Sequence, residues 1–149
     1  MPMPQDVPST THPIHAGLLR RLAAATYDAL LIVALFVIPT SLVMALRGGE
    51  PIPPGSALLQ VLLITTAGVF FIGFWMHGGQ TLGMRAWRLH IEDYQGNTLT
   101  LWRGLVRFIA AIPSIAIFGI GILWLLVDAH KQTLPDRLAG TRVIVVPKT

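Results

Sequence analysis

Two charged side chains lie inside long apolar runs of this sequence, where an ionised group needs a partner or a task. Asp28 is the only charged residue of the run 22–46, and Arg107 lies near the start of the run 105–127. A charged side chain at the centre of a bilayer costs on the order of 2.5–3.5 kcal/mol on insertion scales. Asp28 therefore has two interpretations. It forms an ion pair with Arg107 that locks two apolar segments together, or it carries a proton or a cation along a pathway.

Other charged residues extend this candidate site. Arg21 lies two helical turns before Asp28, on the same helical face. Arg103 lies one turn before Arg107 and could join the same pair. The residues predicted to form ion pairs or to carry function are Arg21, Asp28, Arg107, Asp128, Asp136 and Arg137, and the arginines predicted to lie at the membrane interface are Arg85, Arg88 and Arg103.

The residue types and their spacing give no support for a thiol, metal-ion, nucleophile–base or phosphate-binding site. There is no cysteine, so the chain has no disulfide, thiolate metal site or thiol nucleophile. The five histidines show no zinc-ligand spacing, and no nucleophile–base constellation is visible. The paired glycines at 78–79 lack the strand–helix context and the lysine of a phosphate-binding loop. We therefore expect a protein that is not an enzyme and that uses no cofactor or metal ion.

The composition places the chain in the membrane class. Of its 149 residues, 53% are hydrophobic and 12% are charged, whereas soluble domains usually carry about a quarter charged residues. The net charge of +4 could suggest nucleic acid, but the basic residues flank the apolar runs. We therefore expect the lipid bilayer and its anionic headgroups as partners, and no nucleic acid.

Two apolar runs predict transmembrane helices. The runs 22–46 and 56–76 are each long enough to cross a hydrocarbon core of about 30 Å, and Pro39 is a potential kink in the first. A short turn rich in glycine and proline joins them, so we expect an antiparallel helical hairpin. Residues 1–16 read as a disordered tail, which leaves 17–149 as a single membrane domain.

The second half of the chain is less uniform. Segment 77–104 predicts a polar loop with a short interfacial helix and a β-hairpin, 88–94 with 98–102. The apolar segment 105–127 has proline and glycine near its middle, so it predicts either a third span or a re-entrant pair of half-helices. The tail 128–149 contains a capping-box pattern, Thr-x-x-Asp, then a glycine stop and a β-strand, "TRVIVV".

The distribution of Lys and Arg predicts which side each segment faces. If the N-terminus is cytoplasmic and segment 105–127 is re-entrant, ten basic residues lie on the cytoplasmic side and one lies outside. If that segment spans, the division is six and five. The charge bias favours the re-entrant arrangement, whereas hydropathy alone favours three spans. We expect a mainly α, polytopic helical membrane protein whose β-hairpin and C-terminal strand form a small cap on the cytoplasmic side.

A short motif, Gln-Thr-Leu-x-x-Arg, occurs twice, beginning at Gln80 and at Gln132. Each copy follows an apolar run and precedes a predicted strand. The copies diverge after the arginine, so they indicate a recurring local structure and not a duplicated domain. The charge bias predicts that both copies lie on the cytoplasmic side.

Several of these features together resemble the RDD family of small membrane proteins. They are the arginine pair before Asp28, "GQTLGMRAWRLHIED" after the second run, and "LLVDAHKQTLPDRLAGTRVIV" near the end. The family is named for one Arg and two Asp. The Arg and the first Asp match Arg21 and Asp28. The second Asp is best matched by Asp136, with Asp128 as the other candidate.

The resemblance covers about residues 16–146. It implies an integral membrane domain with a proposed role in transport, sometimes of ions. The sequence departs from the family at Met84, where a basic residue is frequent. We expect a protein of the bacterial inner membrane that transports a cation, a proton or a small solute as a homo-oligomer, with Asp28 as its acidic group. The alternative is a non-transporting scaffold that assembles or stabilises other membrane proteins.

Overall fold

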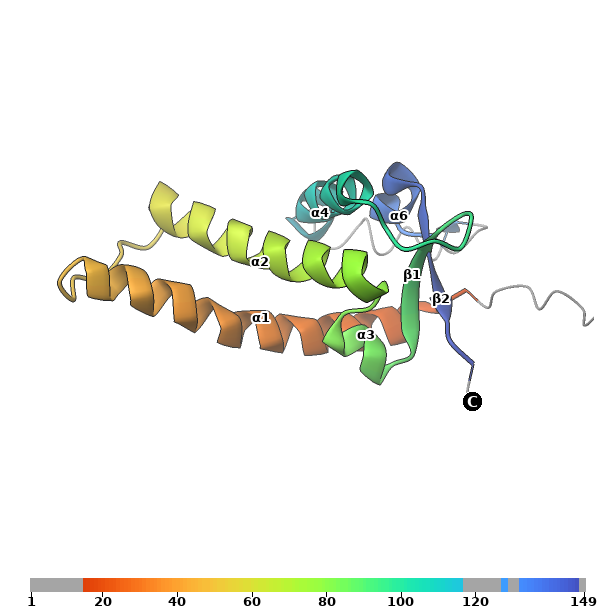
Figure 1. Ribbon diagram of the computed structural model, residues 1–149, viewed down its shortest axis with the longest axis horizontal. Coiled ribbons are helices and arrows are strands. Elements are labelled where there is room, and N and C mark those ends of the chain that lie inside the picture. Colours follow the sequence, from red (N-terminus) through yellow and green to blue (C-terminus); the bar gives the residue numbers. More distant parts are fainter. Residues whose placement is uncertain (1–14, 117–126, 129–131, 148–149) are drawn as a thin grey trace, which may run out of the picture.

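The computed structural model describes residues 15–116, 127–128 and 132–147. Two long helices come first, and shorter helices and strands follow (Figure 1). The elements are α1 (Leu18–Leu46), α2 (Ala57–Gly78), α3 (Leu82–Ala86), β1 (Leu89–Asp93), α4 (Leu101–Ala116), α6 (Leu134–Ala139) and β2 (Thr141–Val145). The fold is mainly helical with a two-stranded antiparallel sheet, which confirms the predicted class.

The helices α1 and α2 form an antiparallel pair that sets the long axis of the molecule (Figure 1). Both are long and apolar enough to cross a membrane. Only 6% of the most apolar window of α1 is buried, and 11% of that of α2, whereas a core helix of a soluble protein would be mostly buried. Their apolar side chains are therefore free to face lipid. The first helix begins one turn earlier than predicted, so Arg20 and Arg21 belong to it.

At one end of this pair, α3, β1, β2 and α6 form a compact unit, the cap, and the loop between α1 and α2 lies at the other end (Figure 1). The strands β1 and β2 pair with Leu89 opposite Val145 and Asp93 opposite Thr141. The inward side chains of both strands are buried in one core cluster with Trp75 of α2. The cap is thus packed directly onto the end of the helical pair.

The predicted β-hairpin of 88–94 with 98–102 is wrong in its second strand. The chain turns after Asp93, whose Oδ1 atom accepts hydrogen bonds from the backbone N–H groups of Gln95 (2.8 Å) and Asn97 (2.9 Å). The next residues lead into α4 because small and apolar side chains recur there at helical spacing. The partner of β1 is the C-terminal strand, which the sequence placed on the same side.

The last two residues of the predicted disordered tail, His15 and Ala16, are ordered and paired with β2. His15 forms a β-bridge with Ile144, and the N–H group of Ala16 donates to the carbonyl of Val143 at 3.2 Å. Ala16 is fully buried. The chain just before α1 is therefore fastened to the free edge of β2. The rest of the predicted tail, residues 1–14, lies outside the described residues.

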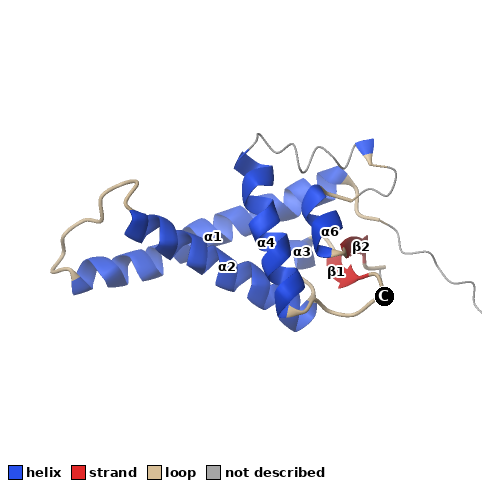
Figure 2. Cartoon of the chain, turned by 90° about the horizontal axis from the view of Figure 1, so that it is seen from above, coloured by secondary structure: helices blue, strands red, loops and turns tan. Residues whose placement is uncertain are grey.

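The helix α4 lies crosswise to α1 and α2 (Figures 1 and 2). Its fully buried positions hold small or polar side chains, and its outer face carries exposed apolar ones. The buried residues are Gly104, Arg107, Ala110 and Ser114, and the exposed ones include Leu101, Trp102, Ile109, Ile112 and Ile115. Neither arrangement predicted for segment 105–127 is confirmed. The segment's first part crosses the pair, and residues 117–126 lie outside the described residues.

The two Gln-Thr-Leu-x-x-Arg copies both lie in the cap, and each begins a short helix. Thr81 is the N-cap of α3, and its hydroxyl oxygen accepts from the N–H group of Met84 at 3.2 Å. Thr133 is the N-cap of α6 and accepts from the N–H group of Asp136 at 3.4 Å. The helix α3 leads into β1, and α6 leads into β2. The predicted recurring structure is therefore confirmed as a threonine-capped turn that feeds a strand.

Candidate functional site

A buried carboxylate clamped by two guanidinium groups connects three helices. Asp136 is fully buried in the first turn of α6. Its Oδ2 atom accepts from Nη1 of Arg21 in α1 at 2.5 Å, and its Oδ1 atom accepts from Nη1 of Arg107 in α4. Oδ2 also accepts from the backbone N–H group of Thr133 at 2.9 Å, which completes the predicted capping box. One side chain thus caps its own helix and holds α1 and α4.

The charge state of this cluster follows from its composition. Burial alone raises the pKa of Asp136, because an ionised carboxylate is poorly solvated there. The guanidinium groups of Arg107 and Arg21 outweigh burial and hold the pKa of Asp136 well below its usual range. The cluster therefore contains two cations and one anion. Arg107 makes a further hydrogen bond to Oγ1 of Thr141 in β2 at 3.0 Å, so the sheet is attached to the same cluster.

Asp28 joins α1 to the other short helix. Its Oδ2 atom accepts from the hydroxyl of Thr81 at 2.5 Å, and its Oδ1 atom accepts from the backbone N–H group of Gly83 at 2.9 Å. The carboxylate is buried and lies at the N-terminus of α3. Gly83 allows this close approach, because a Cβ atom there would clash with the carbonyl oxygen of Ala24 and lie 2.9 Å from Cγ of Asp28.

The ion pair predicted between Asp28 and Arg107 is wrong. Their shallow positions in two apolar runs suggested that they would meet, but α4 crosses the helical pair and packs on α6. Arg107 therefore reaches Asp136, and Asp28 reaches the N-terminus of α3. Arg21 and Asp28 do face the same cavity, as their helical spacing predicts.

The remaining candidates lie nearer the surface. Oδ2 of Asp128 accepts from the N–H group of Gln132 at 3.0 Å, and its Oδ1 atom is 3.5 Å from Nη1 of the exposed Arg137. Arg103 reaches the carbonyl of Gly140 at 3.2 Å and Asp93 at 3.4 Å. Arg103 thereby fastens α4 to the cap. Arg85 and Arg88, predicted with it to lie at the membrane interface, are exposed, and the interfacial position of all three stays a prediction.

Sequence reasoning missed the partners of both carboxylates and one ion pair. Thr81 and Gly83 belong to the first motif copy, and their cap pattern was a usable signal for an acidic partner. The pair Arg142–Glu92, with Nη2 and Oε1 2.6 Å apart, bridges opposite residues of β1 and β2. It could be found only once the register of the strands was known.

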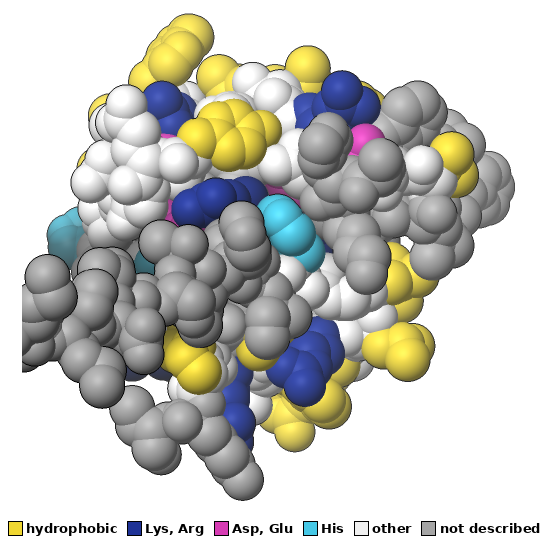
Figure 3. Space-filling view, turned by 90° about the vertical axis from the view of Figure 1, so that its right-hand side faces the viewer, with side chains coloured by type: hydrophobic (Ala, Val, Ile, Leu, Met, Phe, Trp, Pro, Cys, Tyr) yellow, Lys and Arg dark blue, Asp and Glu magenta, His cyan; other side chains and the backbone are white. Residues whose placement is uncertain are grey.

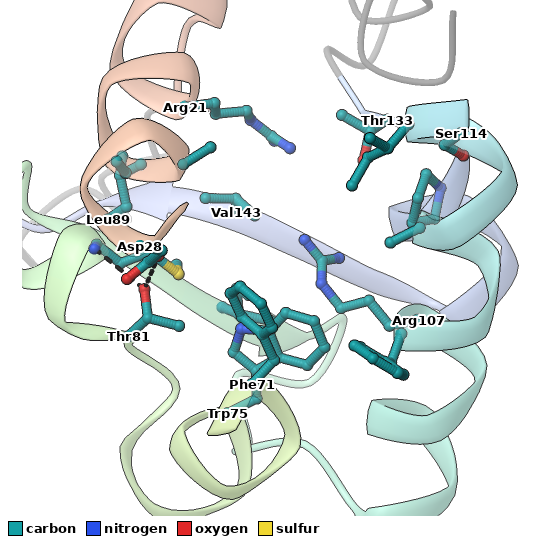
Figure 4. A pocket seen from close by; sticks show the side chains of 18 of the residues that line it. Arg21, Asp28, Phe71, Trp75, Thr81, Leu89, Arg107, Ser114, Thr133 and Val143 are labelled. Atoms are coloured by element: carbon teal, nitrogen blue, oxygen red, sulfur yellow. Dashed lines mark hydrogen bonds between the residues drawn. The ribbon is translucent and has the colours of Figure 1, made fainter. Parts of the chain in front are cut away.

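A cavity of about 390 Å³ lies between α1, α2, α4 and the cap (Figure 4). Its walls are mostly aliphatic and aromatic. The guanidinium of Arg107 extends into it, with Cζ 5.1 Å from the centre of the Trp75 ring. The polar residues that line it are Arg21, Asp28, Thr81, Arg107, Ser114 and Thr133. Within the described ranges, no three His, Asp or Glu side chains are grouped to hold a metal ion.

Comparisons with known proteins place the chain among membrane proteins of one family. The family model described as "RDD family" matches residues 15–140. A protein of Rickettsia prowazekii (strain Madrid E), described as "Uncharacterized protein RP437", is 42% identical over 76 residues. That match covers 50% of this chain and 42% of the relative, so less than half of the relative's length is represented. No solved structure matches the chain.

Proposed function

This chain belongs to the RDD family, and from that premise we propose that it is a non-enzymatic, non-transporting membrane module. Its helical pair would anchor it in the bacterial inner membrane, and the cap would stabilise or assemble other membrane proteins or further copies of the chain. Both family acids that we matched, Asp28 and Asp136, have their oxygen atoms occupied by protein donors. That occupation carries the proposal, because a transport carboxylate must be free to exchange its proton or cation.

The proposed orientation places the cap in the cytoplasm and makes the protein multi-pass. Among the described residues, the loop between α1 and α2 contributes one arginine, Arg47. The arginines of the opposite end are Arg20, Arg21, Arg85, Arg88, Arg103, Arg107, Arg137 and Arg142. Figure 3 shows basic side chains spread over the cap end. Because cytoplasmic segments carry the excess of basic residues, this asymmetry supports a cytoplasmic N-terminus and cap.

Contact with partners would use the helical pair. Its apolar side chains are exposed along most of α1, including Leu30 (68%), Val37 (61%) and Ile38 (66%). In a bilayer these side chains can face lipid or another helix. Neighbouring helices bind one another there through close packing. The surface supports association and does not identify the partner.

A flux experiment separates this function from transport. We expect proteoliposomes with the full chain to show no more proton or cation flux than protein-free liposomes. Asp28→Asn should leave that flux unchanged but lower the thermal stability in detergent, because one of the donors Thr81 and Gly83 loses its acceptor. Glu50→Gln, in the exposed loop, is the matched control and should change neither quantity.

Transport remains the second candidate, because the cavity reaches Asp28 and its wall also contains Ser114 and Thr81. On this alternative the chain transports a cation, a proton or a small solute as a homo-oligomer. Wild-type flux that Asp28→Asn abolishes, with the melting temperature unchanged, would establish transport and reject the module.

A further inference from the structure

We infer that the outer face of α4 lies against the acyl chains of the membrane leaflet nearest the cap, so that α4 is embedded in that leaflet beside the helical pair. Such a position requires that the pair crosses the membrane, as proposed above, and it holds for an assembly module and for a transporter alike. It gives a surface and a partner to the crossing helix, which the proposed assembly through α1 and α2 does not use.

The outer face of α4 is unsuited to water. Every exposed residue of this helix is apolar, and the large ones are Leu101, Trp102, Ile109, Ile112 and Ile115. A helix on the surface of a soluble protein carries charged and polar side chains on its outer face. Continuous exposed apolar surface in proteins usually marks contact with a membrane or with another protein.

The polar side chains of α4 are turned towards the protein. Its only charged or hydroxyl-bearing residues are Arg103, Arg107 and Ser114. Arg103 donates to a backbone carbonyl of the cap at 3.2 Å, Arg107 binds Asp136, and Ser114 donates to the carbonyl one turn earlier at 2.7 Å. The outer face of α4 can therefore enter lipid without taking a charged side chain out of water.

The place where α4 crosses α2 sets its level in the membrane. A Cβ atom added at Gly68 of α2 would lie 3.3 Å from the ring of Phe108, and one added at Gly104 of α4 would lie 3.2 Å from Ile72. The crossing is therefore six to ten residues before the last residue of α2, Gly78, or roughly 9–15 Å along the helix axis.

This level lies within the membrane if α2 crosses it. The 22 residues of α2 extend roughly 33 Å, about the thickness of a hydrocarbon core of ~30 Å. A helix packed on its side some 9–15 Å from the cap end is then about level with the acyl chains of the nearer leaflet. Because α4 runs crosswise to the pair (Figure 2), it lies along the leaflet over its length.

The surface beside the crossing favours lipid over a protein as the partner. Val69 of α2 follows Gly68 and is 71% exposed, so the apolar surface of the pair reaches the level of α4. A water-soluble partner would have to enter the leaflet to contact α4. Close packing between membrane helices favours small or polar side chains, whereas this face presents mainly isoleucine and tryptophan.

Spin labels on single cysteines can measure the depth of α4 in proteoliposomes of the full chain, because the chain has no cysteine of its own. Ile109→Cys is the main position (62% exposed), and Ile112→Cys is a second exposed position one turn later. Collisions of the label with oxygen, which concentrates in lipid, and with a water-soluble nickel chelate give the depth. We expect both labels to lie roughly 5–15 Å below the headgroups.

Two control positions calibrate the depth. Val37→Cys lies midway between Asp28 and Leu46 in α1 and is 61% exposed, so its label should be the deepest, about 15 Å into a core of ~30 Å. Gln95→Cys, in the exposed turn of the cap, should collide mainly with the nickel chelate.

The possible results separate this position of α4 from the anchoring of the pair. A label at Ile109→Cys that meets mainly the nickel chelate, while Val37→Cys stays in lipid, would overturn the position of α4 alone. Contact with the chelate at both positions would overturn the anchoring as well. Protection of Ile109→Cys and Ile112→Cys from both reagents would mean that protein covers α4, and dipolar broadening between labels would then identify a second copy as the occupant in place of lipid.

Discussion

At the scale of single residues, the carboxylates of Asp28 and Asp136 have the same structural role. Each is buried, and each fastens a short helix of the cap to a long neighbour. Asp136 meets two cations, and Asp28 meets a hydroxyl and a backbone N–H group. Removing one member of a buried ion pair leaves its partner's charge without compensation, which typically costs about 3–5 kcal/mol. Asp136 should therefore be the more sensitive position.

The pH dependence of unfolding tests this role of Asp136. Because the pKa of Asp136 in the folded protein lies below its unfolded value, its stabilising effect is complete above pH ~4 and is lost as the pH falls through the lowered pKa. We expect the unfolding midpoint in detergent to be level from neutral pH down to about 4 and to decrease below it. Asp136→Asn should be less stable at neutral pH and should lose part of that acid dependence.

The matched control is Asp128→Asn, whose arginine partner is exposed and 3.5 Å away. Exposed ion pairs contribute about 0–1 kcal/mol. If Asp128→Asn lowers the unfolding midpoint as much as Asp136→Asn does, the buried cluster of Asp136 with Arg21 and Arg107 stabilises the protein no more than an exposed ion pair does.

At the scale of elements, the two short helices differ in where their acidic group comes from. The helix α6 carries its own, Asp136 at the third helical position, whereas α3 has Met84 there and receives Asp28 from α1. A carboxylate from outside the helix thus serves the N-terminus of α3. It also makes the contact between α1 and α3 depend on Gly83, which leaves room for the approach.

Gly83→Ala tests that contact. The added methyl group would clash with the carbonyl oxygen of Ala24 and push Asp28 away. We expect a loss of stability of about 1–3 kcal/mol, as for overpacked sites, measured by thermal unfolding in detergent.

Gly73→Ala in α2 is the control. An added Cβ there meets nothing within 4 Å, and alanine favours a helix by about 0.5–1 kcal/mol over glycine. If Gly83→Ala and Gly73→Ala were equally stable, the close approach of α1 and α3 would not contribute to the stability of the fold.

At the scale of the whole molecule, the two ends of the helical pair differ in charge and in structure. One end is a short loop, and the other holds the cap, the crossing helix α4 and most of the described arginines (Figures 1 and 3). The outer face of α4, which includes Trp102 and Ile109, is apolar and exposed at this end. This asymmetry suits a cap that rests against one leaflet, with α4 at the interface.

Labelling of single cysteines tests the orientation, because the chain has no cysteine of its own. We expect Glu50→Cys in the loop to react with a membrane-impermeant maleimide in intact cells. Gln95→Cys in the exposed turn of the cap should react only after the cells are permeabilised if the cap lies in the cytoplasm, as we propose from the positive-inside rule. The reverse pattern would place the cap outside, and labelling of both positions in intact cells would contradict a membrane-crossing pair.

The sequence by itself determined the features that depend on local order. These are the two apolar helices, the threonine caps of the motif copies, the glycine stop after α6 and the C-terminal strand. Each follows from hydrophobic periodicity or from hydrogen bonds between residues a few positions apart. The family followed from the order of the same motifs.

Only the tertiary structure decided which residues meet. The partner of β1, the crossing of α4 and the pairing of Arg107 with Asp136 instead of Asp28 all join segments far apart in the chain. A charged residue in an apolar run indicates that it needs a partner, because burial without one is costly. The sequence does not indicate which partner, because several arginines and carboxylates are available. Only the packing of the helices brings one of them into contact.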